Sequence, residues 1–463
     1  MDRYKIKTVS LGAQESLPPI LNLAVVGTGI AGLGAAWLLS KHHLVTLFDR
    51  NNYAGGHSNT VTVGRGVRET PVDTGFIVYN ERNYPNLTAL FQHLDIRTQA
   101  SSMSFSVSLD DGQLEYCGEG LGGIFAQRRN IASVSMWRML ADILRFYRSA
   151  RLNGGTSCDE ITIGEFLRIH RYSAVFVNHH LLPMIAAIWS VPSQSAANFP
   201  LATITEFFNN HGLLQFRNRP CWRTVSGGSR EYVKRLLART ASPIQLSRGI
   251  DKIVRTAGGV VLRDQFGDFH NHDGVIIATH ADEALGLIAM PTSEEKRILG
   301  NIRYQPNRAV LHSDTRLMPN HRKVWSSWNV SGVLDSKQPF AITYWMNRLQ
   351  GLSTANPLFV SINPQKEPRA HLIHEVFRYD HPIFDVKAYR AQRQLDQIQG
   401  SGNVWYCGSY FGYGFHEDAL CSGLEIAERF GIQRPWRTNE GSRGSKPDRG
   451  RQLLRKVIGG QGG

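Results

Sequence analysis

Apolar runs and helical periodicity alternate at the start of the chain. An apolar run at residues 23–26 has the length of a strand, and a helical pattern follows with Leu33, Trp37 and Leu38 on one side. A second apolar run covers residues 44–48. This strand–helix–strand order is typical of a parallel α/β unit.

The alternation returns further along the chain, from residue 224 onward. In order, the predicted elements are a helix containing Tyr232, a strand at residues 244–253, a hairpin from 260–262 to 274–278, a strand at 404–409 and a helix at 417–430.

Residues 131–152 predict a basic amphipathic helix. One side carries Arg138, Asp142, Arg145 and Arg148, and another carries Trp137, Leu140, Leu144 and Tyr147. Such a helix either lies on an anionic membrane surface or covers a soluble core with its arginines in water.

Residues 172–205 contain no Asp, Glu, Lys or Arg. Pro183, Pro192 and Pro200 interrupt this stretch, so it does not predict a transmembrane helix. It is either buried core or the wall of an apolar cavity, because the two share a composition. Residues 300–400 are rich in aromatic side chains, several of which alternate with polar residues as in a half-exposed sheet.

The composition is that of a globular protein, with 42% hydrophobic and 19% charged residues. A chain of 463 residues exceeds one simple core, so we expect two joined domains. Residues 1–21 are predicted to be a flexible leader without a secretory apolar segment. No apolar stretch has the length that a membrane span requires.

The five cysteines are scattered and lack C-x-x-C spacing, which argues against a disulfide framework and a zinc site: Cys117, Cys158, Cys221, Cys407 and Cys421. We therefore expect a reducing cytoplasmic location.

The formal net charge is +14, and part of it is concentrated at the end of the chain. Residues 433–463 are predicted to be a disordered tail, in which eight Lys and Arg face two acids. This tail is either solvated or in contact with anionic lipid or nucleic acid. No nucleic-acid-binding motif is present, so no specific nucleic-acid partner is expected.

Gly27, Gly29 and Gly32 form a G-x-G-x-x-G fingerprint between the first strand and helix. Gly27 allows a tight turn, Gly29 lets the backbone approach a pyrophosphate, and Gly32 lets the helix pack close to the strand. The helix N-terminus offers N–H groups and positive dipole to phosphates. Asp49 follows the second strand, where its carboxylate can accept hydrogen bonds from ribose hydroxyls. The segment predicts a dinucleotide site, and the alternative is a glycine-rich turn in an ordinary α/β domain.

Five further segments complete a pattern around this fingerprint: Gly55-Gly56, Asp73–Phe76, Leu246–Ile253, Asp273–Ala278 and Gly408–Ala427. Together these blocks resemble the flavin-dependent amine oxidase and phytoene desaturase superfamily. The resemblance covers most of residues 22–432. Within it, residues 55–60 and the loop 408–416 look most like a bacterial group of FAD-binding oxidoreductases associated with cyclopropane-type fatty-acid modification.

The resemblance implies an α/β fold, in which a Rossmann-type FAD-binding domain carries an inserted α+β substrate domain. The FAD-binding domain would comprise residues 22–100, 225–290 and 400–432. The substrate-binding domain would comprise residues 101–224 and 291–399.

The resemblance also implies non-covalent FAD, because no cysteine stands at the position used for covalent attachment in some amine oxidases. The FAD contacts carried over are Gly27, Gly29, Ala31, Gly32, Asp49, Arg50, Gly55, Gly56, His57, Gly75, Phe76, Ile250, Gly408, Ser409, Asp418 and Ala419.

Two positions depart from the superfamily pattern. Many members carry Arg after the second glycine pair, where this chain has His57, so the positive partner of the pyrophosphate is Arg50 or a partly protonated His57. Many members carry an acid where this chain has Ser409, whose hydroxyl can still hydrogen-bond an oxygen of the cofactor.

Hydride removal by a flavin needs little from side chains, and no catalytic triad or metal cluster is evident in the sequence. The catalytic residue is therefore unassigned, with His416 as the candidate acid or base because an ordinary histidine exchanges protons near neutrality. The candidate substrate-lining residues are Trp189, Tyr344, Tyr410 and Tyr413.

The sequence predicts an FAD-dependent oxidoreductase that dehydrogenates an apolar, lipid or fatty-acyl substrate. An amine oxidase that releases hydrogen peroxide, a non-redox flavoprotein isomerase and a protein that uses FAD only as a structural core are the alternatives. Contact with the inner face of a membrane is an open expectation alongside the cytoplasmic location.

Overall fold

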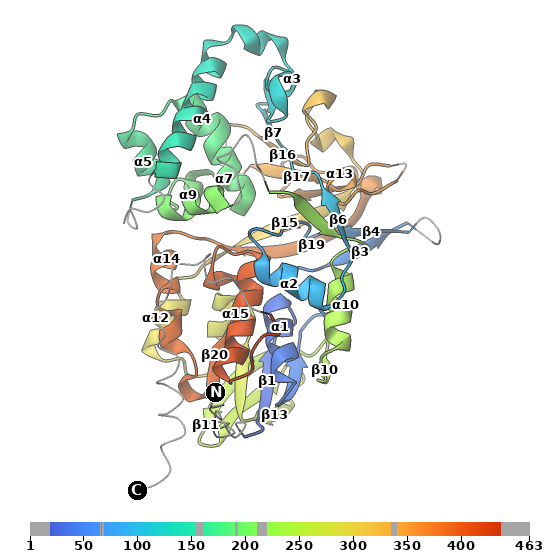
Figure 1. The fold of residues 1–463 in the computed structure, drawn as a ribbon, viewed down its shortest axis with the longest axis vertical. Helices are drawn as coiled ribbons and strands as arrows, with labels where there is room; N and C mark the ends of the chain where they lie inside the picture. Colours follow the sequence, from blue (N-terminus) through green and yellow to red (C-terminus); the bar gives the residue numbers. More distant parts are fainter. Residues whose placement is uncertain are drawn as a thin grey trace, which may run out of the picture.

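The computed structural model describes residues 19–64, 66, 69–152, 161–189, 193–210, 220–334, 340–354 and 356–436. Residues 1–18 of the predicted leader, Cys158 and the tail beyond residue 436 lie outside the described residues. Figure 1 shows two stacked bodies, a lower one around a parallel sheet and an upper one in which helices flank a second sheet. Among the described helices, none combines the length and the apolar character that crossing a bilayer requires.

The lower body is built on a five-stranded parallel sheet. Its strands, in spatial order, are β10 (Ile244–Gln245), β2 (Leu44–Phe48), β1 (Asn22–Val26), β14 (Gly274–Ile277) and β20 (Val404–Tyr406). In the register, Leu23 of β1 lies opposite Val45 and Gly274. Parallel strands covered on both faces are apolar along their length, which is why these strands appear as short apolar runs in the sequence.

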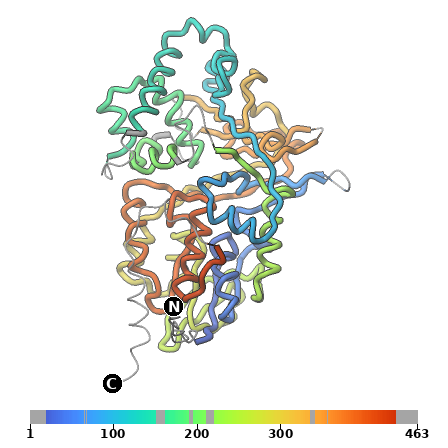
Figure 2. Tube along the Cα trace, in the orientation of Figure 1, coloured from blue at the N-terminus to red at the C-terminus, as the bar shows by residue number. Residues whose placement is uncertain are grey.

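Two helices cover one face of this sheet, and a small antiparallel sheet covers the other. The helices are α1 (Ile30–Leu39) and α15 (His416–Arg429), which share one apolar cluster. Figure 2 shows these blue and red segments side by side, although they come from opposite ends of the chain. The antiparallel sheet consists of β11 (Ile250–Thr256), β12 (Gly259–Asp264) and β13 (Phe269–His272).

Two predicted strand assignments were wrong in this region. The run 244–253 is divided between β10 and β11, which belong to different sheets, and Ser247 at φ 53° forms the turn between them. The predicted hairpin partner 274–278 is instead β14, because β12 pairs with β13. All four residues of β14 are buried, so this strand suits the centre of the parallel sheet rather than a half-exposed hairpin.

The upper body contains a seven-stranded mixed sheet. Its spatial order is β19 (Ile373–Pro382), β15 (Tyr304–His312), β18 (Phe359–Ile362), β17 (Ala341–Trp345), β16 (Trp328–Gly332), β7 (Phe105–Leu109) and β8 (Leu114–Cys117). Only the β7–β16 pair is parallel among these neighbours. Helices gather beside the sheet (Figure 1): α3 (Gly120–Ile124), α4 (Val134–Leu152), α5 (Ile163–Ile169), α6 (Ala174–Phe176), η3 (Val177–Leu181), α7 (Leu182–Trp189), α8 (Ser193–Ala196) and α9 (Leu201–Asn210).

Shorter elements complete the two bodies. The strands are β3 (Thr60–Val63), β4 (Thr70–Asp73), β5 (Tyr79–Asn80), β6 (Thr98–Ser101) and β9 (Trp222–Val225). The α-helices are α2 (Pro85–His93), α10 (Arg230–Ala238), α11 (Ala281–Leu287), α12 (Ser293–Leu299), α13 (Met346–Leu349) and α14 (Val386–Gln392). The 3₁₀ turns are η2 (Arg128–Ala132), η4 (Thr315–Leu317), η5 (Arg322–Val324), η6 (Ala370–Leu372), η7 (Leu395–Ile398), η8 (Ser401–Asn403) and η9 (Ser409–Phe411).

The uncharged stretch 172–205 packs as core. Most of its described large apolar side chains, among them Phe176, Ile185 and Phe199, are buried in one cluster with residues of α4, and others pack against that cluster while partly buried. The same cluster includes Phe384 and is packed against by Phe415, so it extends from the helical end of the upper body to the loop before α15.

The side of α4 that faces this core differs from the predicted one. The buried stripe is formed by Met136, Met139, Ile143 and Phe146, whereas Trp137 and Leu144 are exposed. Asp142, predicted to lie on a solvated side, is buried, and its carboxylate accepts a hydrogen bond from the backbone N–H of Ser173 at 2.9 Å. The helix carries two apolar stripes, one with Met136 and Met139 and one with Trp137 and Leu144. The stripe with the methionines can face inward because the backbone N–H of Ser173 satisfies the carboxylate of Asp142 beside it.

Candidate functional site

The fingerprint glycines form a cradle at the carboxyl end of β1. Gly27 has φ 102°, and a side chain on Gly32 would place its Cβ 1.9 Å from the carbonyl oxygen of Gly27. Gly29 caps α1, and no atom lies within 4 Å of the position that its Cβ would occupy. Because no side chain caps this helix, its first N–H groups face open space, which suits the diphosphate of a dinucleotide. Ala31 is buried in the first turn, where its carbonyl lies against Gly423 of α15.

Asp49 follows β2 and binds the backbone of the same turn. Its Oδ2 accepts from the backbone N and the hydroxyl of Thr28 at 2.8 and 2.5 Å. Its Oδ1 accepts from the backbone N and the side-chain amide of Asn51 at 2.9 and 3.0 Å. Asp49 therefore fixes the shape of the glycine turn, and a ribose hydroxyl would share a carboxylate that already holds four donors.

The second glycine turn lies against the first. The backbone N of Gly55 donates to the carbonyl of Thr28 at 3.0 Å, and a Cβ on Gly56 would lie 3.2 Å from the Cα of Gly29. His57 is the next residue after this contact between the two glycine turns.

Three aromatic or imidazole rings surround His57. The centroid of Tyr379 lies 4.9 Å from that of His57, and those of His381 and His280 lie 5.9 and 6.0 Å away. Burial, reinforced by the neighbouring histidines His381, His280 and His416, holds the pKa of His57 well below its ordinary value. The imidazole is neutral in the free protein at neutral pH.

Arg50, the alternative positive partner, is oriented differently. Its guanidinium forms an ion pair with Glu283 of α11 at 2.7 Å, and the side chain is largely exposed. Of the two predicted partners, His57 is the one whose backbone neighbour contacts Gly29.

Gly75 and Phe76 continue the path from His57. A Cβ on Gly75 would lie 2.3 Å from the carbonyl oxygen of His57, and the backbone N of Phe76 donates to that oxygen at 2.8 Å. The ring of Phe76 stacks on His416, with centroids 3.8 Å apart. The segment after the second glycine turn therefore meets the start of α15.

His416 is held by three groups from separate elements. Besides the Phe76 stack, its Nε2 lies 2.7 Å from the hydroxyl of Tyr232 on α10 and 3.3 Å from that of Ser58. Burial lowers the pKa of His416 to about 3. This shift favours the neutral imidazole, and the role of His416 as an acid or base stays a prediction.

The C-terminal block positions its polar groups on its own backbone. The backbone N of Gly408 donates to the Ser422 hydroxyl at 2.9 Å, and Ser409 opens η9. Asp418 Oδ2 accepts from the backbone N of Tyr413 and of Phe415, at 2.9 and 3.0 Å, so its carboxylate fixes the loop before α15.

Ala419 and Ile250 belong to different apolar clusters of the lower body. Ala419 is buried in the cluster shared by α1 and α15. Ile250 opens β11 and packs near Phe48, while the backbone N of Arg248 donates to the carbonyl of Asp49 at 2.8 Å. Ile250 therefore stands close to the end of β2.

The four predicted substrate-lining residues divide among three places. The indole N–H of Trp189 donates to the carbonyl of Tyr413 at 3.3 Å, so these two are neighbours. Tyr344 lies on β17, with its ring 5.0 Å from that of Trp328. Tyr410, by contrast, is buried in the apolar cluster between the parallel sheet and the antiparallel sheet of β11, β12 and β13.

Three residues that tie the site together were not among the predicted site residues. Glu417 is buried and accepts from the backbone N of Asn86 and of Leu87, so the first turn of α15 caps α2. An acid in a first turn was the available signal, but its partners lie in a remote helix. Tyr232 was noted only for its helical pattern.

Asp73, the third, is a buried junction between the bodies. Its Oδ1 accepts from the Ser229 backbone N and hydroxyl, both at 2.8 Å, and from the Thr60 hydroxyl at 2.6 Å. Its Oδ2 accepts from the Gln350 amide at 2.9 Å. Burial raises the pKa of Asp73 to about 6 although these donors favour the ionised form.

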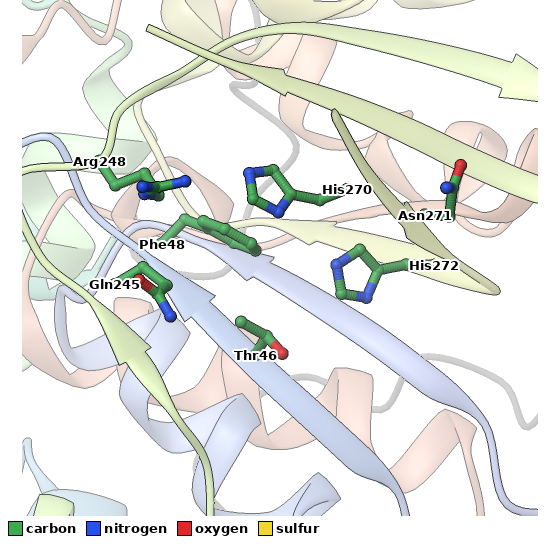
Figure 3. A pocket seen from close by; sticks show the side chains of 7 residues that line it. All are labelled: Thr46, Phe48, Gln245, Arg248, His270, Asn271 and His272. Atoms are coloured by element: carbon green, nitrogen blue, oxygen red, sulfur yellow. The ribbon is translucent and has the colours of Figure 1, made fainter. Parts of the chain in front are cut away.

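A separate pocket of about 450 Å³ opens between β2, β10 and β13. Figure 3 shows the side chains that line it: Thr46, Phe48, Gln245, Arg248, His270, Asn271 and His272. The guanidinium of Arg248 pairs with Asp264 and Asp268, at 2.7 and 3.0 Å. None of the predicted site residues lines this pocket.

Comparisons with known proteins agree with this architecture. A family model described as an NAD(P)-binding Rossmann-like domain matches residues 25–94. Comparison with curated protein sequences gives no match.

Several solved structures resemble the whole fold. A fatty acid isomerase from P. acnes that produces CLA has a TM-score of 0.62 at 15% identity, covering 89% of this chain and 98% of its own. Putrescine oxidase bound to putrescine has a TM-score of 0.62 at 13% identity, with coverage of 89% and 98%. Cyclohexylamine oxidase from Brevibacterium oxydans IH-35A has a TM-score of 0.59 at 14% identity, with coverage of 89% and 99%.

These likenesses define a class of fold: an α/β Rossmann-like dinucleotide-binding domain with a separate mixed-sheet domain. The predicted fold class is confirmed. More narrowly, the arrangement of the two domains is similar to that of these solved structures, which include two oxidases and an isomerase.

Proposed function

We propose that this protein is a flavoenzyme that binds FAD non-covalently and dehydrogenates an apolar, lipid or fatty-acyl substrate. The observation that carries the proposal is a continuous path of site residues from Gly29, past His57, to the Phe76–His416 stack. This path joins two glycine turns to the start of a C-terminal helix.

The residues along the path fit FAD. Open space at Gly29 and the uncapped N-terminus of α1 would receive the diphosphate. The start of α15, at the other end of the path, would direct a helix N-terminus at the flavin, where a dipole stabilises negative charge. Bound FAD would supply hydride acceptance, and the side chains need only bind, orient and exclude water.

The chemistry of the neighbouring side chains favours an apolar substrate. Phe207 stacks on Phe415 with centroids 4.8 Å apart, and Trp189 lies 4.8 Å from Phe207. These rings border the loop that leads into α15. An apolar chain can pack against such rings without burying a polar group.

The buried groups near the path are suited to orientation rather than proton transfer. His416 is neutral and holds a hydrogen bond to Tyr232. Burial raises the pKa of the Tyr379 hydroxyl to about 12, so this group also keeps its proton at neutral pH. Dehydrogenation removes a hydride and a proton, so with bound FAD accepting the hydride the proton would leave to water.

The test is anaerobic reduction of the flavin by a panel of substrates. The purified holoprotein should be yellow, and an unsaturated or saturated fatty-acyl lipid should bleach it while primary and secondary amines do not. Bleaching by amines, with hydrogen peroxide released in air, would establish the amine oxidase alternative. A shifted double bond without net flavin reduction would establish the isomerase. A colourless protein that FAD does not reconstitute would overturn the proposal.

A further inference from the structure

The helical end of the upper body carries an exposed apolar surface. Of the fifteen large apolar side chains exposed in the described part of the chain, five lie between residues 121 and 144. We call these five the α3–α4 surface: Leu121, Ile131, Val134, Trp137 and Leu144, with exposed fractions of 73%, 54%, 82%, 52% and 47%.

These side chains form one continuous surface. Val134, Trp137 and Leu144 are spaced by three and seven positions, so they share the side of α4 opposite its buried stripe. The indole N–H of Trp137 donates to the carbonyl of Ile131 at 2.8 Å. The Trp137 ring lies 5.2 Å from that of Phe125, whose backbone N donates to the carbonyl of Leu121 at 2.9 Å.

Positive charge borders the apolar side chains. Five exposed arginines lie on the same segment: Arg128, Arg129, Arg138, Arg145 and Arg148. The sole acid between residues 120 and 150 is Asp142, which is buried. The exposed carboxylate of Glu119, close to Leu121 in the sequence, is paired with Arg348, and Arg145 is paired with Asp142 at 3.2 Å. The apolar stripe with the other four arginines beside it is complementary to an anionic lipid surface.

We propose that the α3–α4 surface docks this protein on an anionic lipid bilayer. Val134, Trp137 and Leu144 enter the boundary between headgroups and acyl chains, and the arginines pair with lipid phosphates. A second copy of the chain is a poorer occupant, because a symmetric contact would bring the five arginines against their equivalents.

The α3–α4 surface covers the apolar cluster of the upper body. The buried stripe of α4 belongs to the apolar cluster that contains Trp189 and Phe207, and Phe415 packs against that cluster. The surface and the loop before α15 are therefore two sides of one apolar layer. The proposal goes beyond the proposed function and does not depend on it, because vesicle binding requires no turnover.

The experiment is co-sedimentation of the full chain with phosphatidylcholine vesicles, with and without phosphatidylglycerol. We expect wild type to bind the anionic vesicles and V134E/W137E to bind about tenfold more weakly. Met290→Glu is the matched control, because Met290 is equally exposed and lies on the lower body. It should bind within about twofold of wild type, since the basic residues after 436 are unchanged in every variant.

A second set of variants separates electrostatic attraction from apolar insertion. It also includes an alternative variant in case the first one misfolds. R128Q/R129Q/R138Q should lose the preference for phosphatidylglycerol, and added salt should weaken wild-type binding. V134E/L144E leaves the hydrogen bond from Trp137 to Ile131 in place. It replaces V134E/W137E in the binding assay if the melting temperature of V134E/W137E is lowered. Unchanged binding of both glutamate pairs, equal binding to neutral vesicles or capture of a protein partner in place of lipid would each overturn the proposal.

Discussion

The imidazole of His416 lies flat against the ring of Phe76, with centroids 3.8 Å apart and an interplanar angle of 10°. Phe76 follows the second glycine turn, whereas His416 opens the last helix of the described chain. The Nε2 atom of His416 is held by the Tyr232 hydroxyl at 2.7 Å. The stack therefore fixes the position of α15 relative to the dinucleotide cradle.

His416 is predicted to stay neutral throughout the working pH range. Burial lowers its pKa to about 3, so the pH profile of kcat/KM should contain no inflection from this residue between about pH 5 and 8. His416→Gln keeps a hydrogen-bonding group but loses the flat ring, and it should lower the free energy of unfolding by about 1–2 kcal/mol. The measurements are urea unfolding and the pH profile of kcat/KM, each for wild type and for His416→Gln. An inflection near pH 6.5 that disappears in His416→Gln would contradict the prediction.

Acid should unfold this protein because several buried histidines resist protonation. Burial lowers the pKa of His180, His312 and His381 to about 4, and that of His416 to about 3. An unfolded imidazole titrates near about 6.5, so between these values the unfolded chain binds more protons than the folded one. The contribution of these histidines to stability is therefore fully present above about pH 6.5, and it is lost as the pH falls from there toward about 4.

His180 offers a direct check on this acid sensitivity. Its Nε2 is buried without a hydrogen-bond partner, and Phe176 and Tyr116 surround the ring. His180→Phe should therefore move the midpoint of acid unfolding to lower pH, measured by circular dichroism. Asp73 has the opposite effect on stability. Because its pKa is raised to about 6, its contribution to the free energy of unfolding decreases as the pH rises from about 4 to 6. An unchanged midpoint in His180→Phe would show that this histidine is not protonated on unfolding.

Local patterns in the sequence predicted the elements that place the cradle. The strands before Gly27 and Asp49 and the helix after Gly29 follow from apolar runs and glycine spacing, because a parallel strand must be apolar on both faces. The division of residues 244–253 between two sheets did not follow, because its cause is the turn at Ser247 rather than hydrophobicity.

Contacts between distant segments left no local pattern. Glu417 and Asn86 are 331 positions apart, and nothing near either residue identifies the other. Tyr410 and Tyr413 belong to one aromatic loop, yet η9 directs Tyr410 into the core below the parallel sheet while Tyr413 meets Trp189. The aromatic composition indicated the loop but not the direction of each ring.

FAD affinity should increase as the pH falls from about 8 to 6. His57 is neutral in the free protein, and its neighbours on other elements are His280, Tyr379, His381 and His416. A diphosphate placed beside it would raise its pKa, so binding would take up a proton and strengthen by at most about tenfold per pH unit. Flavin fluorescence titration of the apoprotein at several pH values measures the slope.

Two variants isolate His57 in that titration. His57→Gln should weaken affinity and flatten the slope, whereas His57→Arg should restore affinity without the pH dependence, because its charge is permanent. His374→Gln is the control, since His374 lies on the same strand as His381 but binds the Ser313 hydroxyl at the surface. If His57→Gln binds FAD as tightly as wild type and with the same pH dependence, His57 does not contact the diphosphate. FAD binding itself would then still stand.

Glu417 should be the most costly acid of α15 to replace. Glu417→Gln substitutes an amide for one of two oxygens that accept from backbone N–H groups of α2, and a donor would then face a donor. We expect a loss of about 2–3 kcal/mol in the free energy of unfolding, measured with urea. Glu425→Gln, at an exposed position of the same helix, should cost less than about 0.5 kcal/mol. Equal costs would show that the α2 cap contributes nothing to stability.

Replacing Gly29 by alanine should weaken FAD binding, whereas replacing Gly32 by alanine should destabilise the fold. Gly29→Ala adds a Cβ where no atom lies within 4 Å, and φ −62° with ψ 172° suits alanine, so its melting temperature should match wild type. The added methyl group would occupy the space proposed for the diphosphate, and FAD affinity should fall by at least about tenfold. Gly32→Ala would place Cβ 1.9 Å from the Gly27 carbonyl oxygen, which forces the helix away from the strand and should cost about 3 kcal/mol or more. Thermal melts and flavin titration of both variants separate folding from binding. Wild-type FAD affinity in Gly29→Ala would place the dinucleotide somewhere other than this cradle.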